Sequence, residues 1–365
     1  MGQRGGVEVL LTILVVLFVF SVLILVHEAG HLLAAKKAGV NVEVFSLGFG
    51  KRLCGIEVGG TDYRISLFPF GGYVKMEGED PSEVSVSEGG LASKSVGARF
   101  WIMASGAITN YVLAFFLFGI VFMIGAPTLS NEVGQVLEGY PAEKAGIVPG
   151  DVIVNVSGVD TGNWDDVVSA IREGTREQDV LRFTLMRRET EMVVEVEPEI
   201  STVTNVFGQE ISRPMVGIGP RDKVLPVSYN PVEAFYQGGK RLLSLTALTY
   251  RGIWLMITGG MPLRTSVSGP IGIVYFMSQA ARLGIVPLLI ITANVSMALA
   301  IFNLLPFPVL DGGHILFLGV EKITKRPVSP KVQEGLTNAA LLLLIALALF
   351  VSWQDLLKFT PLGRG

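Results

Sequence analysis

Cysteine, histidine and charged residues are all scarce in this chain of 365 residues. The single cysteine, Cys54, excludes intrachain disulfides and cysteine-rich metal clusters. Only 17% of the residues are charged, the formal net charge is −3, and no long basic block is present, so nucleic acid is not indicated as a partner. Half of the residues are hydrophobic, which argues against a soluble multidomain protein.

Four apolar stretches come close to the length of about 20 residues that crosses a bilayer. They run approximately over residues 7–35, 100–124, 284–305 and 338–353. The last is short and would need flanking residues or local bilayer thinning. The first could instead be a secretory signal peptide, but cleavage at Ala34 or Ala35 would discard two of the three histidines. We therefore expect an uncleaved span.

Positive charge in the loops predicts the orientation. The loop after the first span carries Lys36, Lys37, Lys51, Arg52, Arg64 and Lys75, and the loop before the last carries Lys322, Lys325, Arg326 and Lys331. With four spans these loops share one side, which the positive-inside rule makes cytoplasmic. Both termini and the segment 125–283 are then expected on the other side.

The histidines fall in two short motifs. The first is His27-Glu28-Ala29-Gly30-His31, at the end of the first apolar run. An i, i+4 pair places both imidazoles on one helical face, where they can bind zinc with Glu28 beside them as a general base. Burying these side chains in a membrane is costly unless they serve such a purpose.

The second motif, residues 303–314, offers the third ligand in Asp311 or His314. Asp311 is the better candidate, because Pro306 and Pro308 break the third span before it and metal coordination would offset the cost of a carboxylate there. Asn303 can donate a hydrogen bond to a substrate carbonyl. The alternatives are that Asn303 only bends the helix and that Asp311 only caps the next one.

Two segments outside the spans show strand patterns. Residues 42–50 and 63–76 alternate around a Gly59-Gly60 turn, which predicts a small sheet or hairpin pair. Residues 131–199 contain the pattern P-A-x-x-A-G-[ILV]-x-x-G-D-x-I, followed by a helix near 164–172 and strands at 180–187 and 191–197. This segment resembles a PDZ domain of the bacterial protease type, whose groove binds an extended peptide by strand addition.

Taken together, the order of these motifs resembles the site-2 protease family of intramembrane zinc metalloproteases, in its bacterial branch. The motifs are HExxH in span one, a PDZ module after span two, and N-x-x-P-x-P-x-L-D-G in span three. The resemblance implies Zn²⁺ bound by His27, His31 and Asp311, Glu28 as catalytic base and Asn303 as a substrate-positioning group. It also implies a bacterial inner-membrane protein that cleaves single-span substrates, such as pre-trimmed anti-sigma factors and remnant signal peptides.

The chain departs from the family in two places. The family's second span often carries G-P-x-x-N, whereas this chain has Gly106-Ala107-Ile108-Thr109-Asn110, which leaves Asn110 as a polar contact near the site. Only one PDZ-like unit is evident, whereas a member of this branch has two in tandem.

The expected fold is an α-helical polytopic membrane protein with a membrane-associated β region and an extracytoplasmic PDZ domain. Its expected parts are residues 1–36 (first span), 37–98 (β region and loop), 99–126 (second span), 127–200 (PDZ domain), 201–283 (interfacial helix, or a linker packed on the PDZ unit), 284–314 (third span) and 315–365 (loop and fourth span).

We expect an unwound substrate helix to pair with a strand edge at residues 67–74, where Leu67, Phe68, Gly71 and Gly72 would contact it. PDZ-bound peptide tails and membrane lipid are further expected partners. Two competing hypotheses are a PDZ scaffold whose structural zinc has His314 as fourth ligand, and an intramembrane metal carrier.

Overall fold

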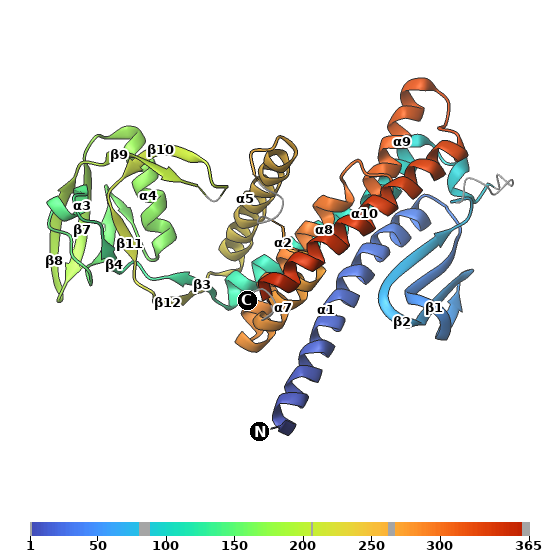
Figure 1. Ribbon diagram of the computed structural model, residues 1–365, viewed down its shortest axis with the longest axis horizontal. Coiled ribbons are helices and arrows are strands. Elements are labelled where there is room, and N and C mark those ends of the chain that lie inside the picture. The colour runs from blue at the N-terminus through green and yellow to red at the C-terminus, as the bar shows by residue number, and fades with distance from the viewer. Residues whose placement is uncertain (1, 80–87, 206, 262–266, 360–365) are drawn as a thin grey trace. The chain divides into compact units, whose positions relative to one another are not determined.

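The structure is a computed structural model that describes residues 2–79, 88–205, 207–261 and 267–359 (Figure 1). These residues fall into two compact units. The first comprises Met1–Val121, Pro231–Ile253 and Pro262–Gly365, and the second comprises Phe122–Asn230 and Trp254–Met261. Residues 80–87, part of the expected β region and loop at 37–98, and the last residues, 360–365, lie outside the described ranges.

Helices dominate the first unit. They are α1 (Gly2–Lys37), α2 (Val96–Ile124), α5 (Pro231–Ile257), α7 (Pro270–Leu283), α8 (Ile285–Asn303), α9 (Asp311–Thr324) and α10 (Pro330–Phe359), with a short 3-10 helix at Leu91–Ser93. Within the described ranges, four helical segments are long and apolar enough to cross a membrane: Leu10–Lys37, Val96–Ile124, Ile285–Asn303 and Pro330–Phe359. The fourth is 30 residues long, because flanking residues on both sides extend the short apolar stretch 338–353, which is one of the two expected ways to lengthen it.

Within the stretch 201–283, expected to be an interfacial helix or a PDZ linker, residues Pro231–Ile257 form one continuous helix, α5, that packs on α2. A Cβ added to Gly238 of α5 would lie 2.8 Å from the backbone nitrogen of Gly119 of α2, and one added to Gly119 would lie 2.3 Å from the Phe235 ring. Small residues therefore bring the two helices together, as is common between membrane helices.

The glycine-rich region forms the predicted hairpin of β1 (Val42–Val58) and β2 (Thr61–Met76), turning at Gly59 and Gly60, whose φ angles of 57° and 76° favour glycine. Both strands bend, so that they form four short segments. Residues 72–75 pair with 44–47 in antiparallel orientation, and residues 61–66 pair with 52–58 in the same way. Residues 62–65 also pair with 44–47, and these two segments run parallel. The segment order is therefore 72–76, 42–47, 61–68, 52–58, and the first and last segments are the edges.

The second unit contains the predicted helix, glycine turn and strand. Its elements are β3 (Ala126–Leu129), β4 (Val133–Val136), α3 (Pro141–Lys144), β5 (Val152–Val156), β6 (Val159–Asp160), α4 (Trp164–Glu177), β7 (Leu181–Arg187), β8 (Thr190–Val196), β9 (Glu199–Thr204), β10 (Glu210–Met215), β11 (Ile218–Pro220) and β12 (Val224–Val227). A four-stranded sheet has the order β6-β5-β7-β8. Asn163 caps α4 by accepting a hydrogen bond from the backbone N–H of Asp166 at 3.1 Å.

The expected end of this unit at residue 200 is too early. β11 pairs with β4 and β12 pairs with β3, so the chain returns to the beginning of the unit before it leaves. Its core gathers Val133 of β4, Val156 of β5 and Phe183 of β7 with Val216, which lies beyond residue 200.

Candidate metal centre

Three potential metal ligands converge in the first unit. The Nε2 atoms of His27 and His31, one turn apart on α1, are 3.3 Å from each other. Asp311 Oδ2 lies 3.3 Å from His27 Nε2 and 3.5 Å from His31 Nε2. Among the described residues, these three side chains have ligand atoms within 4.8 Å of one another, close enough to hold a metal ion together.

The three residues fit zinc. Tetrahedral zinc with bonds of about 2.0–2.2 Å to nitrogen and oxygen separates its ligand atoms by about 3.3–3.6 Å, which matches the spacing of His27, His31 and Asp311. Asp311 Oδ2 is buried and makes no hydrogen bond of acceptable geometry. A bound cation would satisfy this oxygen.

Backbone geometry delivers Asp311 to the two histidines. α8 ends at Asn303, and the prolines at 306 and 308 prevent it from continuing. Asp311 is the first residue of α9, and the turn before it is tight: a Cβ on Gly312 would lie 2.1 Å from the Leu305 carbonyl oxygen. Gly312 is therefore needed after Asp311, because any side chain there would collide with the backbone of the preceding turn.

A backbone carbonyl orients the His31 imidazole, and an amide side chain lies beside His27. His31 Nδ1 lies 2.8 Å from the Ile102 carbonyl oxygen of α2, a hydrogen bond that leaves Nε2 free for a metal. Asn303 Nδ2 lies 3.3 Å from His27 Nε2, so the structure brings Asn303 to the same site.

Close packing of α1 on α2 is part of the site, and the sequence argument missed it. A Cβ on Gly106 would lie 2.3 Å from His31 Nε2 and 2.8 Å from His27 Cε1, and one on Gly30 would lie 2.5 Å from the Ser105 carbonyl oxygen. Thr109 Oγ1 donates to the Val26 carbonyl at 3.0 Å. The signal was present as small residues at helical spacing in both spans.

Glu28 faces the edge segment 72–76 of the hairpin. The Val74 backbone lies close enough to the Glu28 carboxylate for its N–H to act on it, and a Cβ on Gly72 would lie 3.4 Å from Glu28 Cγ. Of the four residues expected to contact substrate on the sheet, Gly72 thus lies at Glu28.

The other three residues lie elsewhere on the sheet. A Cβ on Gly71 would meet the Phe49 ring, and Phe68 pairs with Phe49 on the inner segment that also holds Leu67. The expected edge at 67–74 is therefore narrowed to the segment 72–76, which pairs on one side only, whereas the strand part before Leu67 lies inside the sheet, with partners on both sides at residues 62–65.

Two further candidates lie off the metal centre. Asn110 is 1% exposed, and neither its Nδ2 nor its Oδ1 has a hydrogen-bond partner, while its backbone carbonyl accepts from Ser296 Oγ of α8 at 2.8 Å. His314 is not in the described ligand group and instead lines a neighbouring pocket. The scaffold hypothesis requires His314 as a fourth ligand, and the group of described ligands does not include it.

The comparison with known families decides the identity of this site. The model of Peptidase family M50 matches residues 15–347, which include His27, His31 and Asp311. The chain belongs to this peptidase family. A Campylobacter jejuni protein assigned as a zinc metalloprotease is 33% identical over 354 residues, covering 96% of this chain and 94% of that protein. The chain is accordingly a zinc metalloprotease with Zn²⁺ as its cofactor.

A second relative is the regulator of sigma-E protease of Escherichia coli, which is 31% identical over 436 aligned positions, covering 92% of this chain and 97% of that protein. Because this chain has only 365 residues, that relative contains additional residues within the aligned region. Among solved structures, a PDZ domain of a Listeria monocytogenes protein covers 26% of this chain and 88% of that domain, at 16% identity and a TM-score of 0.20.

Proposed function

We propose that this protein is an intramembrane endopeptidase that hydrolyses peptide bonds within or near the transmembrane segment of single-span membrane proteins. One observation carries the proposal: the ligand atoms of His27, His31 and Asp311 lie at zinc-ligand spacing, and the two histidines stand on α1, a helix apolar enough to cross a membrane. Pre-trimmed anti-sigma factors and remnant signal peptides are the proposed substrates, in regulated intramembrane proteolysis. The name of the Escherichia coli relative supports the first of these.

The proposed ligands are the Nε2 atoms of His27 and His31 and the Oδ2 atom of Asp311. When bound, zinc polarises a substrate carbonyl and makes water acidic enough to lose a proton near pH 7. Glu28 takes that proton and passes it to the leaving amine. The Asn303 amide, which already lies at His27, donates a hydrogen bond to the carbonyl oxygen under attack.

The strand edge at 72–76 is the proposed docking site for the substrate backbone. A peptide bond in a helix is shielded by neighbouring side chains and already hydrogen-bonded, so the substrate must unwind before attack. In lipid an unwound backbone needs new partners, and a free strand edge provides them. Gly72 allows the substrate to approach Glu28 closely, because it has no side chain above the carboxylate.

The proposed orientation places the basic loops in the cytoplasm of a bacterial cell, with the second unit outside the inner membrane. Arg99 at the start of α2 forms an ion pair with Glu321 near the end of α9, which supports the placement of both loops on one side. The groove of the second unit would then recruit substrate tails or exclude bulky proteins.

The test compares the purified wild-type protein with Glu28→Gln on a pre-trimmed single-span substrate, with bound zinc quantified in both. We expect the variant to keep stoichiometric zinc and to lose about 10²- to 10⁴-fold in turnover, since a general base contributes about that much. Glu57→Gln, at the exposed end of β1, is the matched control. Wild-type protein that holds zinc and cleaves neither intact nor pre-trimmed substrates would contradict the proposal.

A further inference from the structure

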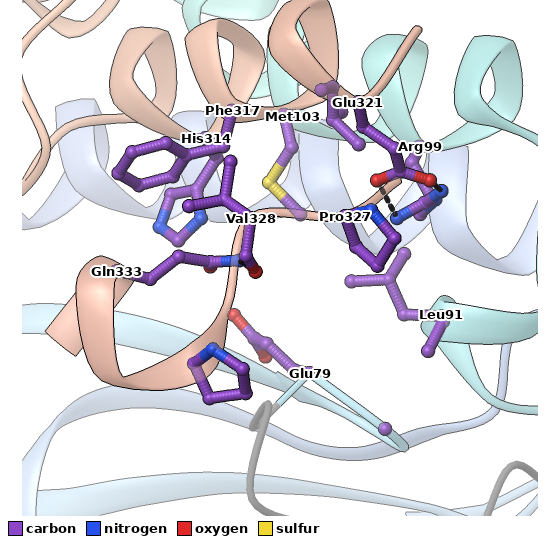
Figure 2. A pocket seen from close by; sticks show the side chains of 14 residues that line it. Glu79, Leu91, Arg99, Met103, His314, Phe317, Glu321, Pro327, Val328 and Gln333 are labelled. Atoms are coloured by element: carbon purple, nitrogen blue, oxygen red, sulfur yellow. Dashed lines mark hydrogen bonds and ion pairs between the residues drawn. The ribbon is translucent and has the colours of Figure 1, made fainter. Parts of the chain in front are cut away.

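A pocket of about 270 Å³ opens in the first unit beside α9 (Figure 2). Figure 2 shows Glu79 on one wall, His314 and Phe317 of α9 on another, and Val328 and Gln333 between them. Small-molecule sites usually measure about 300–1,000 Å³. This pocket is therefore sized for one or two side chains of a polypeptide.

The pocket is adjacent to the metal centre. His314 lies three residues after Asp311 on α9, and so on the same helical face. Met103, in the pocket wall, follows Ile102, whose carbonyl holds His31. Glu79 is close enough to His31, Glu28 and Asp311 for their charges to act on it.

The pocket also continues the substrate-binding edge. Residues 72–76 form the edge segment beside Glu28, and the Met76 backbone N–H donates to Glu79 Oε2 at 3.2 Å. A substrate strand that pairs with this edge would run past Glu28 and then past Glu79. The pocket walls come from the two loops proposed to be cytoplasmic, so this is the cytoplasmic side of the cleavage site.

The uncompensated charge in the pocket is negative. Arg99 and Glu321 neutralise each other through two hydrogen bonds between guanidinium and carboxylate, drawn as dashed lines in Figure 2. Among the residues that the structure describes, no cation pairs with Glu79. A basic side chain entering this pocket would supply that cation.

We propose that the pocket is a specificity subsite for a lysine or arginine on the cytoplasmic flank of the substrate, with Glu79 as its ion-pair partner. This inference rests on the proposed function. Single-span membrane proteins carry an excess of lysine and arginine at that flank. The methylene stem of such a side chain can lie along Leu91, Met103 and Val328 while its charged end reaches Glu79.

The experiment uses the full-length, zinc-loaded protein and paired single-span substrates that differ only by lysine or glutamine, scanned through the cytoplasmic flank. We expect wild-type kcat/KM to be about fivefold higher for the lysine substrate at one position, the effect of a partly exposed ion pair. Glu79→Gln should bring the ratio to about one, and Glu79→Lys should favour a substrate with glutamate at that position.

Glu334→Gln is the matched control, because Glu334 is exposed on α10 next to Gln333 but does not line the pocket. Its lysine-to-glutamine ratio should stay at the wild-type value. Equal cleavage of both substrates by wild type, or a ratio that Glu79→Gln leaves unchanged, overturns the subsite and leaves the proposed function standing. Cleavage of neither substrate by wild type overturns the proposed function itself.

Discussion

The two units treat buried polar groups in opposite ways. In the second unit, Asp151 is 0% exposed and accepts hydrogen bonds from Arg187 at 2.6 and 2.7 Å and from the Val148 N–H at 2.9 Å. In the first unit, Asp311, Asn110 and Asp355 each have a buried polar atom without a hydrogen bond. Ser130 Oγ is the one such side-chain atom in the described part of the second unit.

An unpaired buried polar group costs about 1–3 kcal/mol. The second unit carries this cost at Ser130 Oγ, whereas the first carries it at several described positions. At Asp311 the unpaired oxygen faces two histidines at zinc-ligand spacing, so a bound metal ion would remove the cost there. A buried polar atom without a partner therefore marks the metal centre, and the buried carboxylate of Asp151, which is fully paired, marks a residue that stabilises the fold.

The largest effect should follow from removing a ligand. Asp311→Asn should lower zinc affinity and turnover by about 10³-fold or more, because a three-ligand site is reduced to two strong ligands. The second unit should unfold as in wild type, which hydrogen exchange at its β-strand amides can measure. Zinc binding at wild-type affinity would show that Asp311 is not a ligand.

A methyl group between the helices should have the next largest effect. Gly106→Ala places a Cβ 2.3 Å from His31 Nε2, so the ring must move. We expect turnover to fall by about 10²-fold, as misplacement by about 1 Å can cost that much. Gly97→Ala on the same helix is the control, since a Cβ there meets nothing within 4 Å. Equal activities of the two variants would contradict the role of close helix packing.

The strand edge should give a smaller effect. Val74→Pro removes a backbone N–H of the edge segment close to Glu28 and should lower turnover by about tenfold or more while zinc content stays at the wild-type level. Val74→Ala keeps that N–H and should retain more turnover. Proline at Ile65 does not test the edge, because Ile65 pairs with Leu47 on one side and Cys54 on the other. Turnover in Val74→Pro equal to that in Val74→Ala would exclude substrate pairing at this edge.

The smallest effect on catalysis should come from the second unit. Burial acts to raise the pKa of Asp151, but the Arg187 guanidinium and the Val148 N–H outweigh it and hold this pKa below its ordinary value. The carboxylate therefore stabilises the fold above the ordinary pKa of aspartate, near 4, and this contribution is lost as the pH falls through the lower pKa of the folded state.

Asp151→Asn should accordingly reduce the unfolding free energy of this unit by about 1–3 kcal/mol at pH 7, and by less in acid. Urea unfolding monitored by limited proteolysis measures this loss of unfolding free energy, and Glu173→Gln, at an exposed position, is the control. Zinc content should not change. A loss of stability that is the same at pH 7 and pH 3 would contradict the assigned cause.

Local patterns predicted the elements of both units well. The apolar runs predicted the four described helices that are long and apolar enough to cross a membrane, Gly59 and Gly60 predicted the hairpin turn, and the glycine-aspartate pattern before β5 predicted the start of that strand. Each of these signals lies within a few residues of the structure it specifies. The HExxH spacing similarly specifies one helical face without help from the rest of the chain.

Pairings between distant segments were not visible in the sequence. β12 pairs with β3 across most of the second unit, so nothing near residue 200 marks the true end of that unit. The parallel pairing of residues 62–65 with 44–47 depends on how both strands bend, which alternation alone does not reveal. The carbonyl of Ile102 that orients His31 is a backbone group, and no residue type encodes its role.

Gly30 and Gly106 make the distance between α1 and α2 a component of the metal site. In a bilayer this distance also depends on helix tilt, which responds to the thickness of the surrounding lipid. A detergent or lipid that spreads the two helices by an ångström would therefore dismantle the zinc site while both helices remain folded. Loss of activity on extraction from the membrane would then report altered lateral packing, and a bilayer of matching thickness should restore it.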